Sequence, residues 1–369
     1  MKVDYLKLIN FRNYDYIDLS FDKGVHVLVG DNAQGKTNIL EALFLAVLGK
    51  SFRAGQDEEM IRWECDSSKI DIAFSNQISE NLLQITLSKS GVRENTYNGQ
   101  LRKKRDIIGN LNAVLFCPED LWLIKGSPAI RRRFLDFTLS QIDKRYYHIL
   151  LKYNRVILQR NHLLKKVNYE KGKDEILDIW DDQLIDLATE LFCSRINLVE
   201  ELSVIAKEKY TKIAGGAEIF SAHYFIFCKQ KNEEVQKVNY REWYARNLRV
   251  LRNKDIQKGT TEIGPHKDDV CFFVDSYDAK YFASQGQQRT AIVSLKLAEI
   301  EIMKNKLAEY PILLLDDVMS ELDQYRRKKI IDEINGKIQT FITGTDKIDG
   351  IAKLKATYYS VAAGSIFRI

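Results

Sequence analysis

Apolar and polar positions along the first hundred residues alternate with the two-residue period of β-strands. The alternation predicts strands over residues 2–9, 15–21, 25–29, 69–75 and 82–88. The Asn98-Gly99 pair is the signature of a tight hairpin turn over residues 97–100. One run breaks the pattern: residues 38–48 are almost wholly apolar and long enough for a helix. The amino-terminal third is therefore predicted to be β-rich around a single buried helix.

After residue 105 the pattern acquires a helical period. Residues 111–116 form one more short apolar strand, and Ser127-Pro128 is a helix-start signal. Apolar residues then recur at helical spacing over 146–164 and again over 176–202. A polar segment containing Gly172 joins these two stretches, which predicts an antiparallel helical hairpin. Because the apolar positions lie along one face, we interpret them as ordinary core packing.

The last third returns to a mixed pattern. Strands are predicted over 269–274, 280–282, 312–315 and 339–342, with helices over 287–307 and 325–333. Apolar strands that alternate with helices are typical of a parallel sheet covered on both faces. We therefore expect an α/β head made of residues 1–105 and 259–369, with residues 106–258 as a mainly helical insertion.

A complete phosphate-binding loop, G-x-x-x-x-G-K-[ST], stands between the strand at 25–29 and the helix that follows. It consists of Gly30, Asp31, Asn32, Ala33, Gln34, Gly35, Lys36 and Thr37. Backbone N–H groups in such a loop surround phosphate oxygens, and the helix amino terminus adds a positive dipole end. Lys36 can reach the β- and γ-phosphates, and the Thr37 hydroxyl can hold Mg²⁺. The motif predicts ATP and Mg²⁺ as cofactors, with Lys36 in the catalytic set.

A second acidic motif completes this chemistry. The apolar run 313–315 ends in Asp316-Asp317, the pattern of a Walker-B strand. Asp316 is predicted to hold Mg²⁺, and Asp317 to orient or deprotonate the attacking water. The Asp317 carboxylate is one methylene shorter than the more usual Glu, so we expect slow hydrolysis.

A third motif, Ser284-Gln285-Gly286-Gln287, precedes the long helix. Taken alone, these residues favour an N-capping serine on an ordinary helix. Its place about 30 residues before Asp316 resembles the S-x-G-Q signature of ABC-type ATPases, which contacts nucleotide held by the other subunit of a dimer. Ser284, Gly286 and Gln287 are therefore candidate nucleotide contacts, and Ser320–Asp323 resembles the D-loop that follows.

Composition bounds the class of protein. At 369 residues, 45% hydrophobic and 29% charged, the chain has a soluble globular composition, and we expect a cytoplasmic protein without a membrane span. Five widely spaced cysteines predict reduced core residues rather than disulfides or a zinc site. Residues 101–175 hold 17 Lys/Arg against 8 Asp/Glu, which suggests a polyanionic partner. The candidate contacts to such a partner are the clusters Arg102, Lys103, Lys104, Arg105 and Arg131, Arg132, Arg133, supported by Lys144, Arg145, Lys165 and Lys166. At least one arginine of 131–133 is also expected to make an internal ion pair, with Asp136 as the candidate partner.

Taken together, the motifs resemble the RecF family of bacterial recombination-repair proteins. The resemblance covers nearly the whole chain, with the motifs in the family's order. They are 10–14 (NFRNY), 30–37, 116–121 (FCPEDL), 126–128, 131–136, 264–269 (GPHKDD), 284–290 and 313–323. The resemblance implies an ABC/SMC-like ATPase head with a helical insertion lobe and no long coiled coil.

The same resemblance implies a function. It implies an ATP-dependent homodimer that holds two ATP molecules between subunits and binds DNA at gaps and single-strand/duplex junctions. It also implies RecR as a partner, with RecO and RecA acting through it, and a weak, DNA-stimulated ATPase serving as a switch in repair and SOS induction. Arg12 and Asn13 are implied to approach the nucleotide, Glu119 to occupy the Q-loop position, and Thr343 or Thr345 the γ-phosphate side.

Other readings remain open from the residues alone. An ABC-type subunit acting on a non-DNA partner, such as a transporter, would be expected to carry a Glu after Asp316 and a switch His. A P-loop kinase would lack Ser284–Gln287, and a chromosome-structuring SMC head would need a long coiled coil. His266, beside Pro265 and Lys267, is interpreted as a turn residue or local hydrogen-bond partner without a catalytic role.

Overall fold

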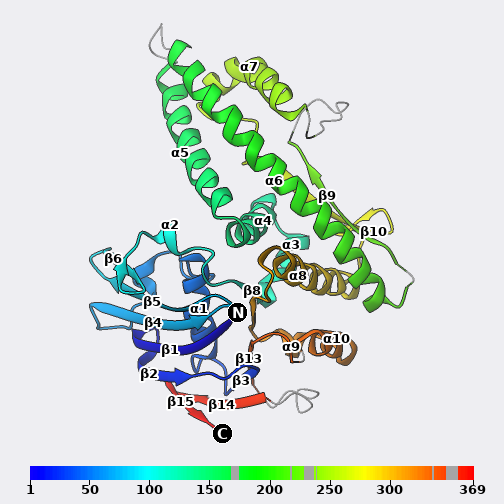
Figure 1. Ribbon diagram of the computed structural model, residues 1–369. Helices are drawn as coiled ribbons and strands as arrows, with labels where there is room; N and C mark the ends of the chain where they lie inside the picture. Colours follow the sequence, from blue (N-terminus) through cyan, green and yellow to red (C-terminus); the bar gives the residue numbers. More distant parts are fainter. Residues whose placement is uncertain (168–173, 217, 228–236, 238, 335, 346–355) are drawn as a thin grey trace. The chain divides into compact units, whose positions relative to one another are not determined.

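The computed structural model describes residues 1–167, 174–216, 218–227, 237, 239–334, 336–345 and 356–369. The chain forms two compact units, each built from separate stretches of sequence (Figure 1). The first, called the head, comprises Met1–Leu121, Ile205–Ile219 and Ser284–Ile369. The second, called the lobe, comprises Trp122–Val204 and Phe220–Ala283.

The head contains a mainly parallel sheet of order β15-β14-β3-β13-β12-β8. Its strands are β3 (Val25–Val29), β8 (Ala113–Phe116), β12 (Ile312–Leu315), β13 (Thr340–Gly344), β14 (Ala356–Ala362) and β15 (Ser365–Arg368). Strands β3, β8, β12, β13 and β14 run parallel, and β15 returns antiparallel to β14. The carboxyl ends of parallel strands meet at one sheet edge, which is where ligands bind in such sheets.

An antiparallel sheet of order β2-β1-β4-β5-β6-β7 completes the β-structure of the head. Its strands are β1 (Lys2–Phe11), β2 (Tyr14–Ser20), β4 (Ser67–Ser75), β5 (Glu80–Ser88), β6 (Arg93–Tyr97) and β7 (Gln100–Leu101). The predicted hairpin turn lies between β6 and β7, with Asn98 and Gly99 at positive φ. Of the strands expected before residue 100, each is present within a few residues.

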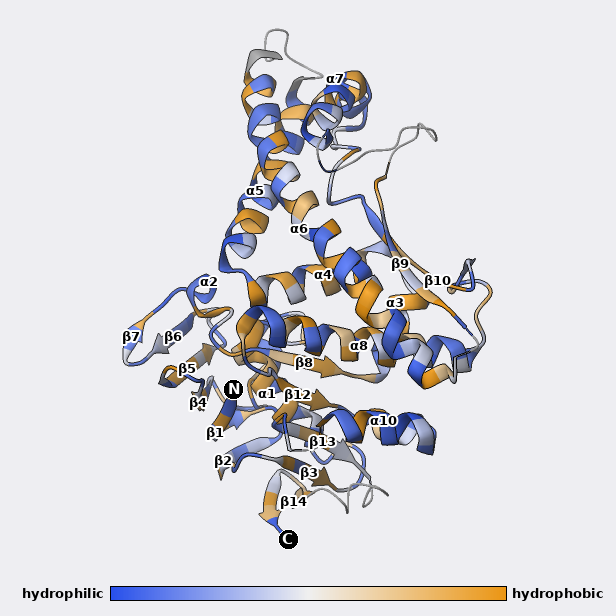
Figure 2. Ribbon diagram, turned by 45° about the vertical axis from the view of Figure 1, so that its right-hand side comes forward, coloured by the Kyte–Doolittle hydropathy of each residue, from blue (hydrophilic) through white to orange (hydrophobic). Residues whose placement is uncertain are grey.

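Helices cover the head's sheets. They are α1 (Lys36–Leu48), α2 (Lys104–Ile107), α8 (Gln285–Leu307), α9 (Val318–Glu321), α10 (Gln324–Ile334) and the short 3₁₀ turns η1 (Asp57–Met60) and η2 (Pro118–Leu121). One buried cluster joins β3, β12 and β13 to α8 and α10 through Val27, Leu313, Ile342, Val293 and Ile330. Strands β8 and β12 and helix α1 are accordingly coloured as apolar in Figure 2. This burial holds the strand ends that carry the motifs in fixed positions.

The lobe is helical with a small antiparallel sheet, β11-β10-β9. Its elements are α3 (Trp122–Lys125), α4 (Pro128–Ile142), α5 (Lys144–Val167), α7 (Tyr240–Lys258), β9 (Phe220–Phe225), β10 (Asp269–Val274), β11 (Tyr277–Asp278) and most of α6 (Asp174–Ala214). Ion pairs Arg145–Glu190 and Arg160–Asp181 show that α5 and α6 run antiparallel, as the sequence predicts. The joining segment around Gly172 lies outside the described residues.

Three sequence-based expectations differ from the structure. The boundaries at 105/106 and 258/259 fall elsewhere, because β8 pairs with β12 in the head and β10 pairs with β9 in the lobe. The strand predicted over 280–282 is a turn. The free cysteines 65, 117, 193 and 271 are half-buried rather than core, and Cys228 is outside the described residues. Within the described part of the chain, none of the helices has the length and apolar character needed to span a membrane.

Candidate functional site

The phosphate loop leaves the carboxyl end of β3 at Gly30 and enters α1 at Lys36. Two of its glycines are required by close approach. A Cβ on Gly30 would stand 2.2 Å from the Val361 carbonyl oxygen, and one on Gly35 would stand 2.6 Å from the Asn13 side chain. Gly35 also has φ 112°, which side chains rarely adopt. The loop is therefore shaped by a backbone contact at Gly30 and by side-chain contacts at Gly35 that leave no room for a Cβ.

Lys36 lies inside this loop. Its buried side chain donates from Nζ to the carbonyl oxygens of Gly30 and Asp31 at 2.6 and 2.8 Å. These two carbonyls hold the ammonium against the backbone at the start of the loop. A phosphate bound by the amides would meet a cation already in place.

Thr37 is joined to the Walker-B aspartate, as the motifs predict. Its Oγ1 donates to Asp316 Oδ1 at 2.8 Å, and Thr343 Oγ1 donates to the same oxygen at 2.9 Å. The Asp317 backbone N–H donates to Thr343 Oγ1 at 2.8 Å. Thr343, on β13, therefore bonds both Walker-B aspartates from the neighbouring strand, and Thr345 is exposed.

The electrostatics of Asp316 suit a cation. Burial raises the pKa of its carboxyl, and hydrogen bonds from Thr37 and Thr343 oppose that rise. A carboxylate next to a threonine hydroxyl offers the hard oxygen ligands that Mg²⁺ prefers. The residues present thus fit the predicted Mg²⁺ site.

Arg12 and Asn13 flank the loop in different ways. Arg12 is committed to an internal pair: Nε and NH2 donate to Glu41 at 2.8 and 2.6 Å, and NH1 donates to the Glu59 carbonyl. Glu41 is fully buried on α1, so it needs this partner. Asn13 instead donates to the Gln34 carbonyl at 2.8 Å and accepts from Asn38. Arg12 therefore holds α1, and only Asn13 bonds the loop directly.

A cavity of about 560 Å³ opens beside these residues. It is lined by Arg12, Asn13, Asn38, Glu59, Ile61, Arg62, Trp63 and Glu64. Trp63 is 91% exposed, so the face of its indole is open to a planar ligand. Trp63 lies in no recognisable motif, so this part of the cavity wall could not be predicted from the sequence.

The β14–β15 hairpin contacts the phosphate loop. Ala363 N–H donates to the Gln34 side-chain oxygen at 2.6 Å, and Gly364 lies so close to the Asn13 carbonyl that an added Cβ would be 2.5 Å away. In Figure 1 this hairpin runs alongside β2 and β3. The strands were missed because residues 356–368 carry no clear alternation.

The predicted signature forms the start of α8. Ser284 is its N-cap: the hydroxyl accepts from Gln287 N–H at 3.2 Å, and the Gln287 side chain accepts from Ser284 N–H. Gln287 also donates to Glu218, and the Gly286 carbonyl accepts from Arg326. Ser284 is therefore a helix N-cap, as the first interpretation of the motif predicted. Its side chain is exposed at the helix amino terminus. The structure does not bring these residues into hydrogen bonds with the phosphate loop.

The basic cluster at 102–105 is largely at the surface. Arg102, Lys103 and Arg105 are exposed, whereas Lys104 packs against Gly49. Burial, aided by nearby Arg93, lowers the pKa of Lys104 to about 8. Three of the four candidates are therefore exposed, and their contact with DNA stays a prediction.

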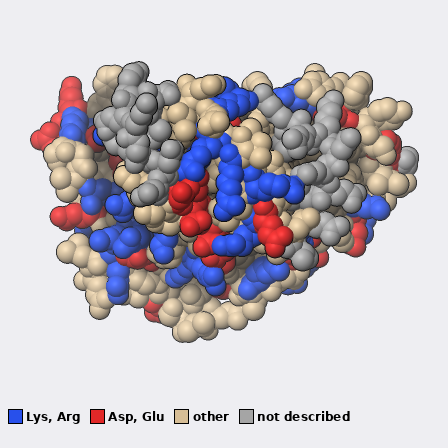
Figure 3. All heavy atoms as spheres, turned by 90° about the horizontal axis from the view of Figure 1, so that it is seen from above, with Lys and Arg blue, Asp and Glu red and all other residues tan. Residues whose placement is uncertain are grey.

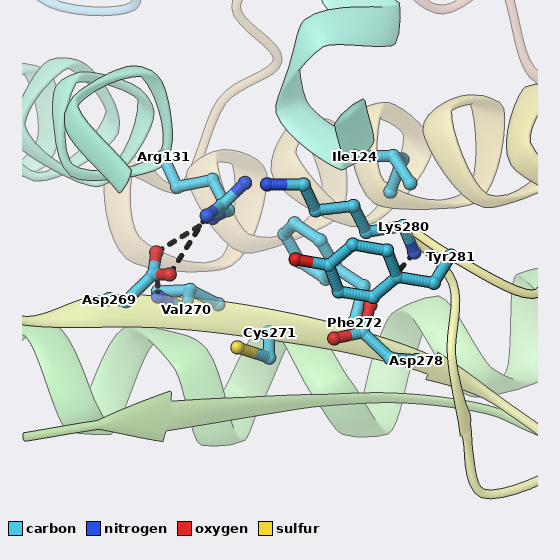
Figure 4. A pocket seen from close by; sticks show the side chains of 9 residues that line it. All are labelled: Ile124, Arg131, Asp269, Val270, Cys271, Phe272, Asp278, Lys280 and Tyr281. Carbon is cyan, nitrogen blue, oxygen red and sulfur yellow. Dashed lines mark hydrogen bonds and ion pairs between the residues drawn. The ribbon is translucent and has the colours of Figure 1, made fainter. Parts of the chain in front are cut away.

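The second cluster is tied into the lobe. Arg131 is buried and makes a two-fold pair with Asp269, Nε to Oδ1 at 2.7 Å and NH2 to Oδ2 at 2.8 Å. Figure 4 shows this pair in the wall of a pocket of about 120 Å³ between α4 and β10. Arg132 donates to the Asp268 carbonyl at 2.7 Å. The structure therefore contradicts a free DNA contact for Arg131, and of this cluster only Arg133 is exposed.

Other basic side chains of residues 101–175 pair with acids from outside that stretch. Arg145 pairs with Glu190, and Arg160 pairs with Asp181 and Asp255. On the face drawn in Figure 3, basic side chains likewise stand among acidic ones. The positive excess of residues 101–175 is thus partly compensated by acidic side chains from elsewhere in the chain.

Two residues left without a firm role are now placed. His266 bonds Tyr153 through Nδ1 at 2.7 Å and the Thr261 carbonyl through Nε2 at 3.0 Å, and burial lowers its pKa to about 4. It is a neutral structural histidine, as interpreted. Glu119 is exposed on η2, while its neighbour Asp120 pairs with Lys296 at 3.2 Å. The Q-loop role of Glu119 stays a prediction.

These features define a class: an α/β P-loop ATPase head of the ABC/SMC type. Comparisons agree. The family model described as "RecF/RecN/SMC N terminal domain" matches residues 2–356. An SMC head from Pyrococcus furiosus, 17% identical, superposes with a TM-score of 0.57 over 100% of this chain and 95% of that one, which supports the fold alone.

The particular relatives are more specific. The chain is 43% identical to "DNA replication and repair protein RecF" of Halalkalibacterium halodurans, with 99% of each covered, and 40% identical to that of Bacillus subtilis, with 95% of each covered. A solved structure titled "Structure of the recombination mediator protein RecF-ATP in RecFOR pathway" is 33% identical, with a TM-score of 0.92 over 100% of this chain and 97% of that one. The chain belongs to the RecF family.

Proposed function

We propose that this chain is an ATP-dependent DNA-binding protein of replication and recombinational repair. The observation that carries the proposal is the hydrogen bond from Thr37 to Asp316, residues 279 apart in sequence, beside a complete phosphate loop. It assembles the ligands that a Mg²⁺–nucleotide needs. Family membership supplies the DNA partner, because the relatives are named for replication and repair.

At the nucleotide, each residue has a stated task. Amides of Gly30–Thr37 and Lys36 bind the phosphates, Thr37 and Asp316 hold Mg²⁺, and Asp317 orients the attacking water. Mg²⁺ would supply charge neutralisation for the β- and γ-phosphates. The cavity beside Asn13 and Trp63 receives the nucleoside, with Arg12 acting through Glu41 to fix the helix behind it.

ATP then acts as a switch on assembly. Ser284, Gly286 and Gln287 lie at an exposed helix amino terminus that donates to anions, away from hydrogen bonds with the chain's own loop. A second copy would bring its nucleotide to this end, giving a dimer with two shared sites. The dimer engages single-strand/duplex junctions in the cytoplasm, acts with RecR, and through RecO helps load RecA. Slow, DNA-stimulated hydrolysis releases it.

The test of this proposal is light scattering of the parent, Lys36→Arg and Ser284→Arg proteins with ATP, Mg²⁺ and gapped DNA. We expect the parent to dimerise only with ATP. Lys36→Arg should lose nucleotide binding or turnover, because its bulkier fork does not fit between the Gly30 and Asp31 carbonyls. Ser284→Arg should bind ATP and stay monomeric. Dimerisation of both variants at the parent's level would refute the shared-site model.

DNA binding should depend on the exposed cluster of the head. Replacing Arg102, Lys103 and Arg105 together with alanine removes three candidate phosphate contacts. Each contact contributes roughly one unit to the slope of log affinity against log salt. We therefore expect the slope to fall by about 2–3 units, with equal loss on any sequence, measured by fluorescence anisotropy between low and moderate salt.

The matched control is Lys104→Ala, because this side chain lies against Gly49 rather than in solvent. It should leave the salt slope within about half a unit of the parent's. An unchanged slope in the triple variant would place the DNA surface elsewhere.

The alternative, an ABC-type subunit acting on a non-DNA partner, shares the nucleotide chemistry. It differs in one outcome: gapped DNA would change neither turnover nor dimerisation. The same light-scattering series with and without DNA therefore separates the two functions.

A further inference from the structure

Two arginines cross between the start of α8 and the segment that follows Asp317. Arg326, on α10, donates from NH2 to the Gly286 carbonyl at 2.9 Å. Arg289, on α8, donates from NH1 to the Glu321 carbonyl at 2.6 Å. Helix α8 and the segment after Asp317 are thus joined by two arginine side chains, each of which donates to a backbone carbonyl of the other element. All four residues lie in the head.

Arg326 is the more heavily bonded of the two. Besides Gly286, its Nε and NH2 donate to Thr290 Oγ1 at 2.9 and 2.7 Å, and Thr290 donates in turn to the Gly286 carbonyl. On its other side, NH1 donates to Asp323 Oδ2, and Asp323 Oδ1 accepts from the Arg326 backbone N–H. The fixed fork of a guanidinium is suited to hold three partners at once.

The partners divide by role. Gly286 lies inside the signature Ser284–Gln287, and Asp323 ends the D-loop segment Ser320–Asp323. Thr290, one turn further along α8, is buried at 2% exposure, so its hydroxyl needs the bonds it makes. The ion pair to Asp323 is half-exposed and contributes little by itself. What Arg326 adds is a mechanical link between two segments.

We propose that Arg326 is a positioning residue that couples the signature to the D-loop segment, an inference that rests on the proposed ATP-dependent dimer. It sets the carbonyl of Gly286, and hence the direction of the first turn of α8, relative to the turn after Asp317. When the nucleotide of a second copy binds at Ser284, a shift of the first turn of α8 would move Asp323 through Arg326. The segment beside the Walker-B aspartates would then change with it. Lysine cannot replace it, because a single ammonium nitrogen cannot occupy the separate positions from which Nε, NH1 and NH2 reach Thr290, Asp323 and Gly286.

The test compares Arg326→Ala, Arg326→Lys and Thr290→Val with Lys328→Ala, an exposed position on the same helix. All four should bind ATP as monomers within about twofold of the parent, since the phosphate loop is untouched. ATP-dependent dimerisation should weaken about tenfold in the first three variants and stay unchanged in Lys328→Ala, where tenfold corresponds to about 1.4 kcal/mol. The double variant Arg326→Ala/Thr290→Val should dimerise with ATP no more weakly than Arg326→Ala alone, because the two residues act through the same bond.

A second readout does not need the dimer. In nucleotide-free protein, hydrogen exchange of the amides from 286 to 290 should be faster in Arg326→Ala than in the parent or in Lys328→Ala. Parent-like exchange and parent-like dimerisation in Arg326→Ala would overturn this inference alone. If the parent itself stays monomeric with ATP, or if Ser284→Arg dimerises, the proposed function fails and the coupling has nothing to transmit.

Discussion

Replacing Gly30 with alanine will abolish ATP binding and destabilise the head. The added Cβ would stand 2.2 Å from the Val361 carbonyl oxygen, a backbone atom of β14 that cannot rotate away. Forcing extra volume into a packed site costs up to about 3 kcal/mol, and a clash with backbone belongs at the upper end. Because β14 also pairs with β3 directly before the loop, relief requires movement of the loop itself. We expect at least a hundredfold loss of ATP affinity, about 2.7 kcal/mol, in titration calorimetry.

The control is Gly99→Ala in the β6–β7 hairpin. Gly99 has φ 77°, and an added Cβ meets nothing within 4 Å. Only the cost of a left-handed conformation applies, about 1–2 kcal/mol, and ATP affinity should not change. If Gly30→Ala bound ATP like the parent, the contact between β14 and the loop would be unimportant, and the hairpin would be mere edge structure.

The phosphate loop and the Walker-B aspartates could be predicted because their signals are local. A strand, a glycine turn and a helix follow one another within some twenty residues around Gly30, so the sequence itself specifies their geometry. The apolar run before Asp316 likewise identifies it as the end of a buried strand. The pairing of Thr37 with Asp316 then follows from the parallel sheet, which aligns the ends of β3, β13 and β12.

The long-range partners could not be predicted. Arg12 was expected to approach the nucleotide, and it lines the cavity beside the loop, but its bond to Glu41, 29 residues away on a buried helix, was not foreseen. A signal did exist, because a charged residue within the apolar run 38–48 requires an opposite charge. An internal ion pair was expected within residues 131–133 with Asp136, yet the arginine that makes it is Arg131 and its partner is Asp269, 138 residues away. Charge clusters read along a sequence do not show which members face inward.

The domain boundaries were displaced for a related reason. The pattern of apolar and polar residues changes at residue 105 and after 258. Strands, however, pair with their neighbours in the folded structure, wherever those neighbours lie in the sequence. The strand at residues 113–116 was assigned to the insertion because helices follow it in the sequence. In the structure it is the edge strand beside β12 in the head. Residues 269–274 look like part of the α/β head and instead pair with β9 in the lobe. Non-local hydrogen bonding therefore decides membership of each unit.

The lobe contains the second large expected effect: Arg160→Ala will destabilise it by about 3–5 kcal/mol. Arg160 is fully buried and bonds Asp181 at 2.6 Å, Asp255 at 2.7 Å and Thr261 at 2.8 Å. Removing the guanidinium leaves two carboxylates, 8% and 0% exposed, without their counter-charge. Urea unfolding followed by tryptophan fluorescence will measure the loss, because three of the four tryptophans belong to the lobe.

The same variant should show a distinctive dependence on pH. Burial already raises the pKa of Asp181 and of Asp255, with Arg160 opposing the rise. Without Arg160 both values rise further, so the folded lobe takes up protons at a pH where unfolded carboxylates, with a pKa near 4, do not. Stability relative to the parent is then recovered as pH falls, and the deficit at pH 8 should exceed that at pH 5.

Arg145→Ala is the matched control, because Arg145 also joins α5 to α6. Its side chain is 77% exposed and its partner Glu190 is 43% exposed, so its removal should cost less than about 1 kcal/mol, with no recovery at low pH. Equal losses in the two variants would mean that burial does not set the strength of these links. A large loss confined to Arg160→Ala would show that the buried ion pairs of Arg160 strengthen the α5–α6 hairpin far more than the exposed pair does, and that they also fix α7 through Asp255.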